Sequence, residues 1–322
     1  LIYYMSMKIL VTGCAGFIGM HLCKKLLDKN YVIGIDNINS YYDINLKKDR
    51  LKELKKFKNF KFFKTDLVNS NSLNKIFKKY KIDKIIHLAA QAGVRYSIEN
   101  PKKYLNSNFV GFFNILELSR INKIKKIIYA SSSSVYGNTK KFPLNEYSSL
   151  NPNNFYGLSK KTNEEIASIY AKYYKLKLIG IRFFTVYGEW GRPDMSIFKI
   201  IDASFKNKIF YLNNYGKHHR DFTYIGDVVK MLKKLKFRKK TTNEIYNISS
   251  NKPIKLGVIF NILSKYMKLP KIKKRQLQKA DVVKTHGNNL KIIKNTGFKN
   301  FTNFEMGLLN TLKWYKAYNR IN

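Results

Sequence analysis

A run of four serines, Ser131 to Ser134, is followed along the chain by a Tyr-x-x-x-Lys pair, Tyr156 and Lys160. Residues four apart on a helix share one face, so the phenol and the ammonium group would stand one turn apart. The charge of Lys160 would favour the phenolate form of Tyr156, and a phenolate near neutral pH acts as a general base. With hydroxyl groups beside it, this pair predicts chemistry in which a proton is removed from an alcohol.

The Tyr-x-x-x-Lys spacing carries little weight by itself, because it recurs at Tyr4/Lys8, Tyr80/Lys84, Tyr136/Lys140 and Tyr173/Lys177. Tyr156 differs because it opens an expected helix just after Pro152 and because strand-end serines precede it. A tyrosine that only packs at the start of a helix is the alternative interpretation.

Short β-rich runs alternate with helical periodicity, which is typical of an α/β protein with a parallel sheet. We expect strands at residues 8–12, 31–36, 61–66, 84–90, 125–132 and 178–186, and helices near 17–29, 72–80, 101–121 and 155–175. The predicted fold class is a doubly wound parallel sheet (Rossmann) with a smaller mixed α/β C-terminal lobe. We expect residues 7–187 to form the first domain and 188–322 the lobe, with about 222–250 returning to the first domain. Ligands would bind between them, at the carboxyl ends of the strands.

The first expected strand leads into a Gly-x-x-Gly-x-x-Gly turn made by Gly13, Gly16 and Gly19. Glycines allow the backbone to approach a pyrophosphate, whose charge is favoured at the start of the following helix. Asp36 ends the next strand, where a carboxylate accepts hydrogen bonds from both adenosine ribose hydroxyls and would repel a 2′-phosphate. The pattern predicts NAD rather than NADP, with a tight turn that holds no ligand as the alternative.

Composition indicates an ordinary globular protein, because 322 residues with 44% hydrophobic content are enough for a sizeable core. No apolar run approaches the roughly 18 to 20 residues that span a bilayer, and residues 1–7 are too short for a secretory signal. We therefore expect a cytoplasmic protein without a membrane partner. Cys14 and Cys23 are expected to be reduced, packed thiols.

The formal net charge of +42 raises the question of nucleic-acid binding, because basic stripes release counterions from phosphate backbones. The cations are 53 Lys against 9 Arg, and they are spread along the whole chain. Proteins that grip nucleic acid concentrate their charge and use Arg for bidentate phosphate contacts. We therefore expect solvated surface lysines and no specific nucleic-acid partner.

The histidines do not indicate a metal site. His218 and His219 have no Cys or carboxylate at ligand spacing except Asp221, so we expect no metal. His87 lies inside an apolar strand, where a core histidine satisfied by a hydrogen bond is expected.

From Lys8 to about Tyr318 the chain resembles the extended short-chain dehydrogenases/reductases, in particular the NAD-dependent sugar-nucleotide epimerases and dehydratases. In that family the hydroxyl three residues before a Val-Tyr-Gly tripeptide, here Ser132, bonds the sugar 4-hydroxyl. The resemblance implies that Tyr156 is the acid/base, that Lys160 is its partner, and that hydride passes from sugar C4 to tightly held NAD. It implies NAD contacts at Gly13, Gly16, Phe17, Ile18, Gly19, Asp36, Asn37, Asp66, Leu67, Leu88, Ala89, Ala90, Gln91, Asn108, Tyr156, Lys160 and Phe183. As bare residues, Asp66 and the 89–91 segment are equally compatible with strand-end caps.

The serine run discriminates between branches of this family. Dehydratases carry an Asp-Glu pair directly after the catalytic hydroxyl residue, and related decarboxylases carry a glutamate at the second of those positions. This chain has Ser133 and Ser134 there. Without a carboxylate, elimination lacks its acid and base, so the sequence points to return of hydride to the opposite face, which is 4-epimerisation.

Three segments, 36–43, 90–97 and 182–195, resemble UDP-glucuronate 4-epimerases, whereas UDP-glucose 4-epimerases have Asn in place of Thr185 and no match to Arg192. An oxidised hexuronate is a β-keto acid that loses carbon dioxide when its carboxylate bond aligns with the ketone. Arg192 with Thr185 and the hydroxyls of Ser133 and Ser134 would hold the carboxylate out of that alignment. A surface arginine in a loop is the alternative for Arg192.

At the nucleotide end, Arg220 matches the family position that pairs with the diphosphate. Asp281 is expected to contact a ribose or a loop, and Arg95 completes the set of substrate-binding residues. The chain departs from its relatives at Ala280, where glycine is usual, and at Gly226, where an acidic residue is frequent.

We therefore expect an NAD-dependent 4-epimerase of a UDP-sugar, most specifically UDP-glucuronate to UDP-galacturonate. The alternatives are a UDP-glucose or UDP-N-acetylhexosamine 4-epimerase and, from another class, a non-catalytic NAD-bound or polyanion-binding scaffold. Family resemblance also predicts a homodimer formed through helices within residues 108–121 and 155–175, although their lysines would oppose pairing.

Overall fold

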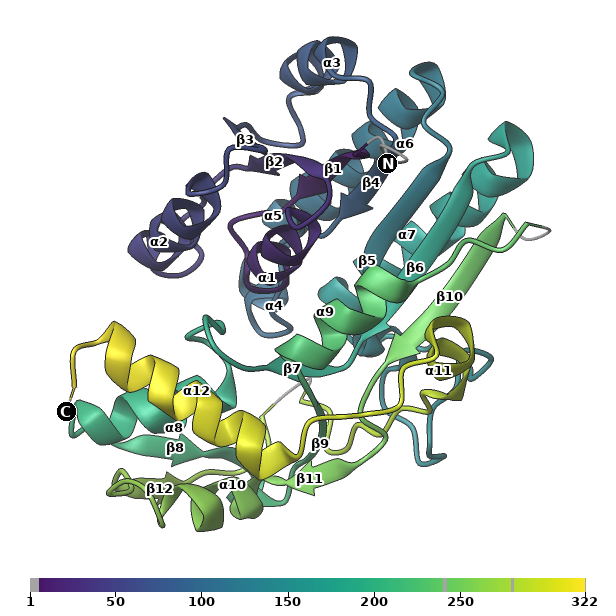
Figure 1. The fold of residues 1–322 in the computed structure, drawn as a ribbon. Coiled ribbons are helices and arrows are strands. Elements are labelled where there is room, and N and C mark those ends of the chain that lie inside the picture. Colours follow the sequence, from purple (N-terminus) through teal and green to yellow (C-terminus); the bar gives the residue numbers. More distant parts are fainter. Residues whose placement is uncertain (1–5, 240–241, 279–280, 322) are drawn as a thin grey trace.

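The computed structural model describes residues 6–239, 242–278 and 281–321. Seven strands form one parallel sheet in the order β10-β6-β5-β4-β1-β2-β3 (Figure 1). They are β1 Lys8–Thr12, β2 Tyr31–Asp36, β3 Phe60–Lys64, β4 Lys84–His87, β5 Lys126–Ser132, β6 Lys177–Phe183 and β10 Asn243–Ile248. The strand order reverses between β1 and β4, so the carboxyl ends of these strands diverge and leave a crevice for a ligand. The predicted doubly wound α/β fold is confirmed.

Helices cover both faces of this sheet. One face carries α1 Phe17–Leu26, α2 Ile44–Lys55, α9 Ile225–Lys234 and α11 Leu290–Thr296, and the other carries α3 Ser70–Lys79, α6 Gly111–Ile121 and α7 Phe155–Tyr174. Successive strand side chains point to opposite faces, so Ile9 and Val11 belong to the first core and Leu10 to the second. Among the described residues, none of the helices combines the length and the apolar character required to cross a membrane.

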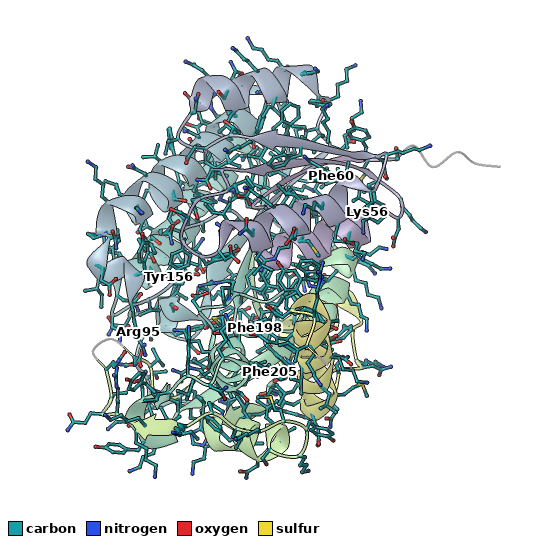
Figure 2. All side chains as sticks on the ribbon, turned by 90° about the vertical axis from the view of Figure 1, so that its left-hand side faces the viewer. Lys56, Phe60, Arg95, Tyr156, Phe198 and Phe205 are labelled. Atoms are coloured by element: carbon teal, nitrogen blue, oxygen red, sulfur yellow. The ribbon has the colours of Figure 1, made fainter. Side chains whose placement is uncertain are left out.

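The remaining elements gather at the lower end of the molecule in Figure 1 around a third hydrophobic core. A three-stranded sheet, β11-β9-β7, and a two-stranded sheet, β12-β8, form its framework. The elements are β7 Thr185–Tyr187, α8 Ser196–Phe205, β8 Phe210–Leu212, the 3-10 turn η3 Asn213–Gly216, β9 His219–Tyr224, β11 Pro253–Lys255, α10 Leu256–Leu263, β12 Ile272–Lys274 and α12 Phe304–Tyr318. Figure 2 shows Phe198 and Phe205 in this lower part and Tyr156 above it, beside the large sheet.

Two expectations about the elements were wrong, and one helix was missed. The expected strand 178–186 is two strands, because pairing with the large sheet ends where Phe184 donates its N–H to the carbonyl of Ile248, and Thr185–Tyr187 (β7) then pairs with β9. The expected helix 101–121 is α5 Pro101–Tyr104, a π-helical turn η1 Leu105–Val110, and α6, with the short α4 Tyr96–Glu99 before it. Helix α2 was not predicted, since its lysine-rich sequence hides a buried stripe of leucines. The boundary at residues 187 and 188 remains a prediction, although α9 and β10 do pack with the large sheet.

Candidate active site

A cavity of about 1300 Å³ opens at the carboxyl ends of the strands. Every residue predicted for the site lines this cavity except Asn108. Its walls come from the glycine turn, from the ends of β2, β4, β5 and β6, from β7 and the loop after it, and from the segments around Arg220 and Asp281. Residues scattered over the whole sequence therefore meet in one place.

The glycine turn forms the floor expected for a pyrophosphate. Gly13 has φ +74, and a Cβ there would lie 2.7 Å from the amide nitrogen of Ala89. A Cβ on Gly19 would lie 2.0 Å from the carbonyl oxygen of Gly13, so no side chain fits at either position. Helix α1 begins after Gly16 without a side-chain cap, which leaves its first N–H groups free to bind an anion. The turn therefore fits a dinucleotide.

Asp36 stands beside this turn at the end of β2. Its carboxylate accepts hydrogen bonds from the N–H groups of Ala15 at 3.1 Å and Ile38 at 2.9 Å. Burial raises the pKa of Asp36, and the hydrogen bond from Ile38 opposes that rise. Next to it, Asn37 donates to Asp66 at 2.7 Å, which fixes two of the predicted adenine-end residues relative to each other.

Asn108 does not line the cavity but supports its wall through hydrogen bonds to the backbone of Gln91. It lies in the π-helical turn η1, is 1% exposed, and holds the backbone of Gln91 by a donated and an accepted hydrogen bond of 3.0 and 2.8 Å. Its amide also donates to the Ser159 hydroxyl at 3.0 Å. These contacts give Asn108 a positioning role behind the cavity wall, and its direct contact with the cofactor stays a prediction. π-Helical turns of this kind recur at functional sites.

The predicted catalytic residues meet where β5 and α7 lie side by side. The side chain of Asn154 caps α7 by accepting the N–H of Gly157 at 2.8 Å, which starts the helix just before Tyr156. Lys160, one turn further, is 2% exposed and donates to the carbonyl of Ala130 at 2.9 Å. The ammonium group is thereby fixed behind the end of β5.

Burial dominates the titration of this pair. It lowers the pKa of Lys160 to about 8, and the charge of Glu164 opposes the shift. It raises the pKa of Tyr156, while the hydroxyl of Ser132 and the charge of Arg192 oppose the rise. The expected lowering of the phenol pKa by Lys160 is therefore not produced by the chain on its own.

Ser132, Ser133 and Ser134 turn at the end of β5 into the 3-10 helix η2 Ser133–Tyr136. The Ser132 hydroxyl donates to the Ser134 hydroxyl at 3.2 Å and accepts the N–H of Ser134 at 3.1 Å. All three residues line the cavity, as does Thr185 at the start of β7. The site thus presents a row of neutral hydroxyl groups beside Tyr156.

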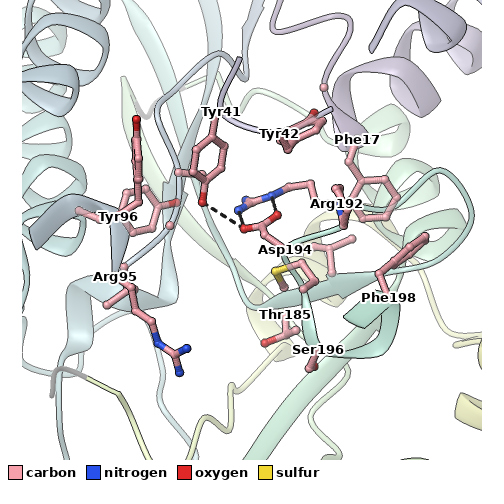
Figure 3. A pocket seen from close by; sticks show the side chains of 18 of the residues that line it. Phe17, Tyr41, Tyr42, Arg95, Tyr96, Thr185, Arg192, Asp194, Ser196 and Phe198 are labelled. Atoms are coloured by element: carbon pink, nitrogen blue, oxygen red, sulfur yellow. Dashed lines mark hydrogen bonds and ion pairs between the residues drawn. The ribbon is translucent and has the colours of Figure 1, made fainter. Parts of the chain in front are cut away.

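Arg192 lies in the same cavity, but its guanidinium group already has a partner. Its Nε and Nη2 donate to the two carboxylate oxygens of Asp194, the Nε bond being 2.9 Å, and the hydroxyl of Tyr41 donates to Asp194 at 3.1 Å (Figure 3). The ring of Tyr41 also lies 5.7 Å from the Arg192 carbon Cζ. Asp194 raises the pKa of Arg192, and Arg192 holds the pKa of Asp194 below its usual range against the effect of burial.

The predicted nucleotide-end residues form a group of charges at the other side of the cavity. Asp281 forms an ion pair with Arg95 at 2.7 Å and lies 3.9 Å from the His218 ring. Arg220 donates to the carbonyls of His219 and Val283, and burial lowers its pKa to about 10. Asp281 therefore joins two segments of the cavity wall, and its contact with a ribose stays a prediction. The Ala280 departure lies outside the described residues.

Two side chains that the sequence analysis passed over support the site. Arg50 of α2 is fully buried and donates to the carbonyls of Ala15, Trp190 and Gly191, which ties the glycine turn to the loop before Arg192. The leucine spacing of α2 is the signal that would have found this helix. Glu164 lies two turns after Tyr156 and forms a buried ion pair with Arg182 at 2.7 Å.

The remaining expectations concern side chains away from the reaction. His87 is 1% exposed and its Nδ1 is 2.9 Å from the Thr12 hydroxyl, which confirms a core histidine satisfied by a hydrogen bond. Cys14 and Cys23 are free, buried thiols, as predicted. Within the part of the chain that the structure describes, no group of three or more His, Cys, Asp or Glu is arranged to hold a metal ion.

The family model described as GDP-mannose 4,6 dehydratase matches residues 10–311. UDP-glucuronate 4-epimerase 4 of Arabidopsis thaliana is 39% identical over 97% of this chain and 76% of its own length. The solved UDP-glucuronic acid 4-epimerase of Bacillus cereus, in complex with UDP-glucuronic acid and NAD, has a TM-score of 0.90 and 29% identity, and covers 97% of this chain and 100% of that one. The UDP-glucose 4-epimerase of Thermotoga maritima, with UDP-glucose, has a TM-score of 0.86 and 28% identity, and covers 97% and 100%. The chain therefore belongs to the NAD-dependent epimerase and dehydratase family, among its UDP-sugar 4-epimerases.

Proposed function

We propose that this protein interconverts UDP-glucuronate and UDP-galacturonate. The observation that carries the proposal is the composition of one cavity, in which a Ser132–Tyr156–Lys160 set faces neutral Ser133 and Ser134 and lies close to Arg192. The first three residues suit oxidation of an alcohol, and the others suit a substrate that brings its own carboxylate. The likeness to UDP-glucuronate 4-epimerases supports the same substrate.

The chemistry begins at the sugar 4-hydroxyl. Tyr156 takes the proton of this hydroxyl, and Ser132 holds its oxygen by a hydrogen bond. Lys160 contributes a fixed positive charge and a donor for the nicotinamide ribose. The glycine turn and Asp36 would hold NAD, which would supply a hydride acceptor for C4 and a donor for the return step. Between these steps the keto sugar rotates in the cavity and presents its other face, so hydride returns to the opposite face of C4.

The neighbouring serines decide what does not happen to the keto sugar. Elimination across C5 and C6 needs a base for the C5 proton and an acid for the leaving hydroxyl. Ser133 and Ser134 stand directly after Ser132 and have neither a carboxylate nor a group that titrates near neutral pH. The 4-keto intermediate is therefore reduced rather than dehydrated.

A hexuronate keto sugar must also be kept from losing carbon dioxide. Arg192 and the hydroxyls of Thr185, Ser133 and Ser134 line the cavity and are the groups suited to hold its carboxylate. Restricting rotation of the carboxylate keeps the bond to C5 out of line with the ketone π-system.

The test is incubation of the purified protein with UDP-glucuronate, followed by proton NMR. We expect UDP-galacturonate to accumulate to an equilibrium mixture with no added NAD beyond that which co-purifies. A UDP-pentose as the main product would assign the protein to the decarboxylases, and absence of turnover with UDP-glucuronate would contradict the proposal.

A UDP-hexose is the second candidate substrate. It is favoured by the pairing of Arg192 with Asp194, because a guanidinium group that is already neutralised has no need of a substrate carboxylate. Ratios of kcat/KM for UDP-glucuronate, UDP-glucose and UDP-N-acetylglucosamine separate the two candidates.

We also propose that the protein is a homodimer. Large apolar side chains lie exposed on η1, α6 and α7, among them Val110, Phe113, Ile121, Ile169 and Tyr173. Helices α6 and α7 pack against each other, and we expect these exposed side chains to share one face. A second copy that pairs through this face would cover them.

A further inference from the structure

Asp194 stands in an unusual relation to Arg192. Its two oxygens take the fork of the guanidinium group, and Tyr41 supplies a third hydrogen bond. The side chains are 22% and 29% exposed, so water screens the two charges only in part. Figure 3 shows the pair surrounded by Tyr41, Tyr42 and Thr185, inside the same cavity that holds the catalytic residues.

A guanidinium group has two edges that can bind a carboxylate through two hydrogen bonds, one formed by Nε and Nη2 and the other by Nη1 and Nη2. In Arg192 the edge formed by Nε and Nη2 is used by Asp194. A carboxylate on the substrate must therefore displace Asp194 from this edge or bind the edge formed by Nη1 and Nη2, directly beside Asp194. A second negative charge beside an Asp194 that stays in place would be repelled.

We propose that Asp194 is a specificity-determining residue, an internal carboxylate that occupies Arg192 and yields it to the carboxylate of a UDP-hexuronate. The inference rests on the proposed function and names the device that sets its selectivity. With a neutral hexose the Arg192–Asp194 pair stays closed. With a hexuronate the guanidinium group exchanges one carboxylate for another, and Tyr41 keeps the released Asp194 hydrogen-bonded.

Because Asp194 competes with the substrate carboxylate for Arg192, its charge lowers the affinity for a hexuronate but not for a neutral hexose. Replacing Asp194 by Asn retains the size and the acceptor oxygen for Tyr41, but removes the competing charge. Because the pair is partly exposed, its worth is that of a moderate ion pair, equivalent to about three- to tenfold in affinity. The neutral hexose does not compete for Arg192, so its affinity is expected to change by less than about twofold.

Binding is measured by calorimetry in a Tyr156→Phe background loaded with NAD, which prevents turnover during the titration. Asp194→Asn in this background should lower the Kd for UDP-glucuronate and leave the Kd for UDP-glucose nearly unchanged. Asp202→Asn is the matched control: Asp202 lines the same cavity but contacts Lys206 and Tyr315 instead of Arg192. It should not change the ratio of the two affinities. Thermal melts show whether each variant is folded.

A rise in the Kd for UDP-glucuronate, or an equal change for both ligands, would overturn the proposal and make Asp194 a simple support for Arg192. If the protein with Asp194 intact fails to bind UDP-glucuronate, the proposed function fails. In that case the Asp194→Asn variant tests the carboxylate exchange separately. A gain of UDP-glucuronate binding in this variant would support the exchange, and no gain would reject the exchange together with the proposed function.

Discussion

The chemistry of the site depends on single side chains whose charges are set by burial. Lys160 is packed behind β5 with its pKa lowered to about 8, and Glu164 on the same helix opposes that shift. The same burial raises the pKa of Tyr156, so the chain alone holds the phenol protonated near neutral pH. The proton transfer from the sugar therefore depends on groups that bind in the cavity as well as on the pair itself.

At the same scale, Arg192→Ala tests the carboxylate clamp. Loss of a charge-assisted hydrogen bond should lower kcat/KM for UDP-glucuronate by about tenfold or more. The share of UDP-pentose relative to UDP-galacturonate should rise, because the keto acid rotates freely. Both products are quantified by proton NMR.

The control for this change is Lys199→Ala, which removes another cation that lines the cavity from α8. It should leave the product ratio unchanged. If Arg192→Ala also leaves the ratio of pentose to epimer unchanged, Arg192 does not restrain the carboxylate.

Whole elements are held in register by a few buried polar groups. Arg50 of helix α2 lies between the glycine turn and the loop that carries Arg192. It donates to three carbonyl oxygens and to the Tyr42 hydroxyl, the last bond being 2.7 Å. Asn108 in η1 holds Gln91 in a similar manner. Both side chains connect segments that would otherwise be independent loops.

Arg50→Met should leave these carbonyl oxygens buried without donors and destabilise the protein by about 2–4 kcal/mol. It should also reduce the NAD retained per chain after gel filtration, because the glycine turn loses its support. Melting temperature and the absorbance of released NAD are the measurements.

Lys52→Met, on the exposed side of the same helix, is the matched control and should change neither quantity. Normal retention of NAD by a destabilised Arg50→Met protein would limit Arg50 to a role in stability.

On the scale of the whole molecule, the +42 charge and the apolar face of η1, α6 and α7 act in opposite directions. Like charges on two copies repel each other over about 10 Å at 0.1 M salt, whereas burial of apolar area favours pairing at any salt concentration. The proposed dimer therefore should tighten as the salt concentration rises.

Phe113→Glu places a charge among the exposed apolar side chains of α6 and should convert the dimer to a monomer in sedimentation velocity. Met306→Glu, an exposed apolar position on α12, should leave the sedimentation coefficient unchanged. A monomer before any substitution, at both low and high salt, would contradict the dimer.

The features that could be predicted from the amino-acid sequence are those encoded locally. The glycine spacing, the carboxylate at the end of β2, the Tyr-Lys pair one helical turn apart, and the serines in place of carboxylates all depend on short stretches of chain. Their chemistry follows from residue type and from the period of one element, so it was readable without coordinates. The parallel sheet followed from the same alternation of short runs.

Which distant side chains neutralise one another depends on the packing of the folded chain. Three contacts join segments that are far apart along the chain: Tyr41 donates to Asp194, Arg50 donates to Ala15, and Asn108 accepts the N–H of Gln91. Even the short-range Arg192–Asp194 pair depends on the loop conformation that Arg50 holds. A charged residue in a lysine-rich sequence looks the same whether it faces water or a carbonyl, because packing alone sets its dielectric surroundings and its partner. That is why the sequence named Arg192, and why the structure was needed to show that Asp194 already holds it.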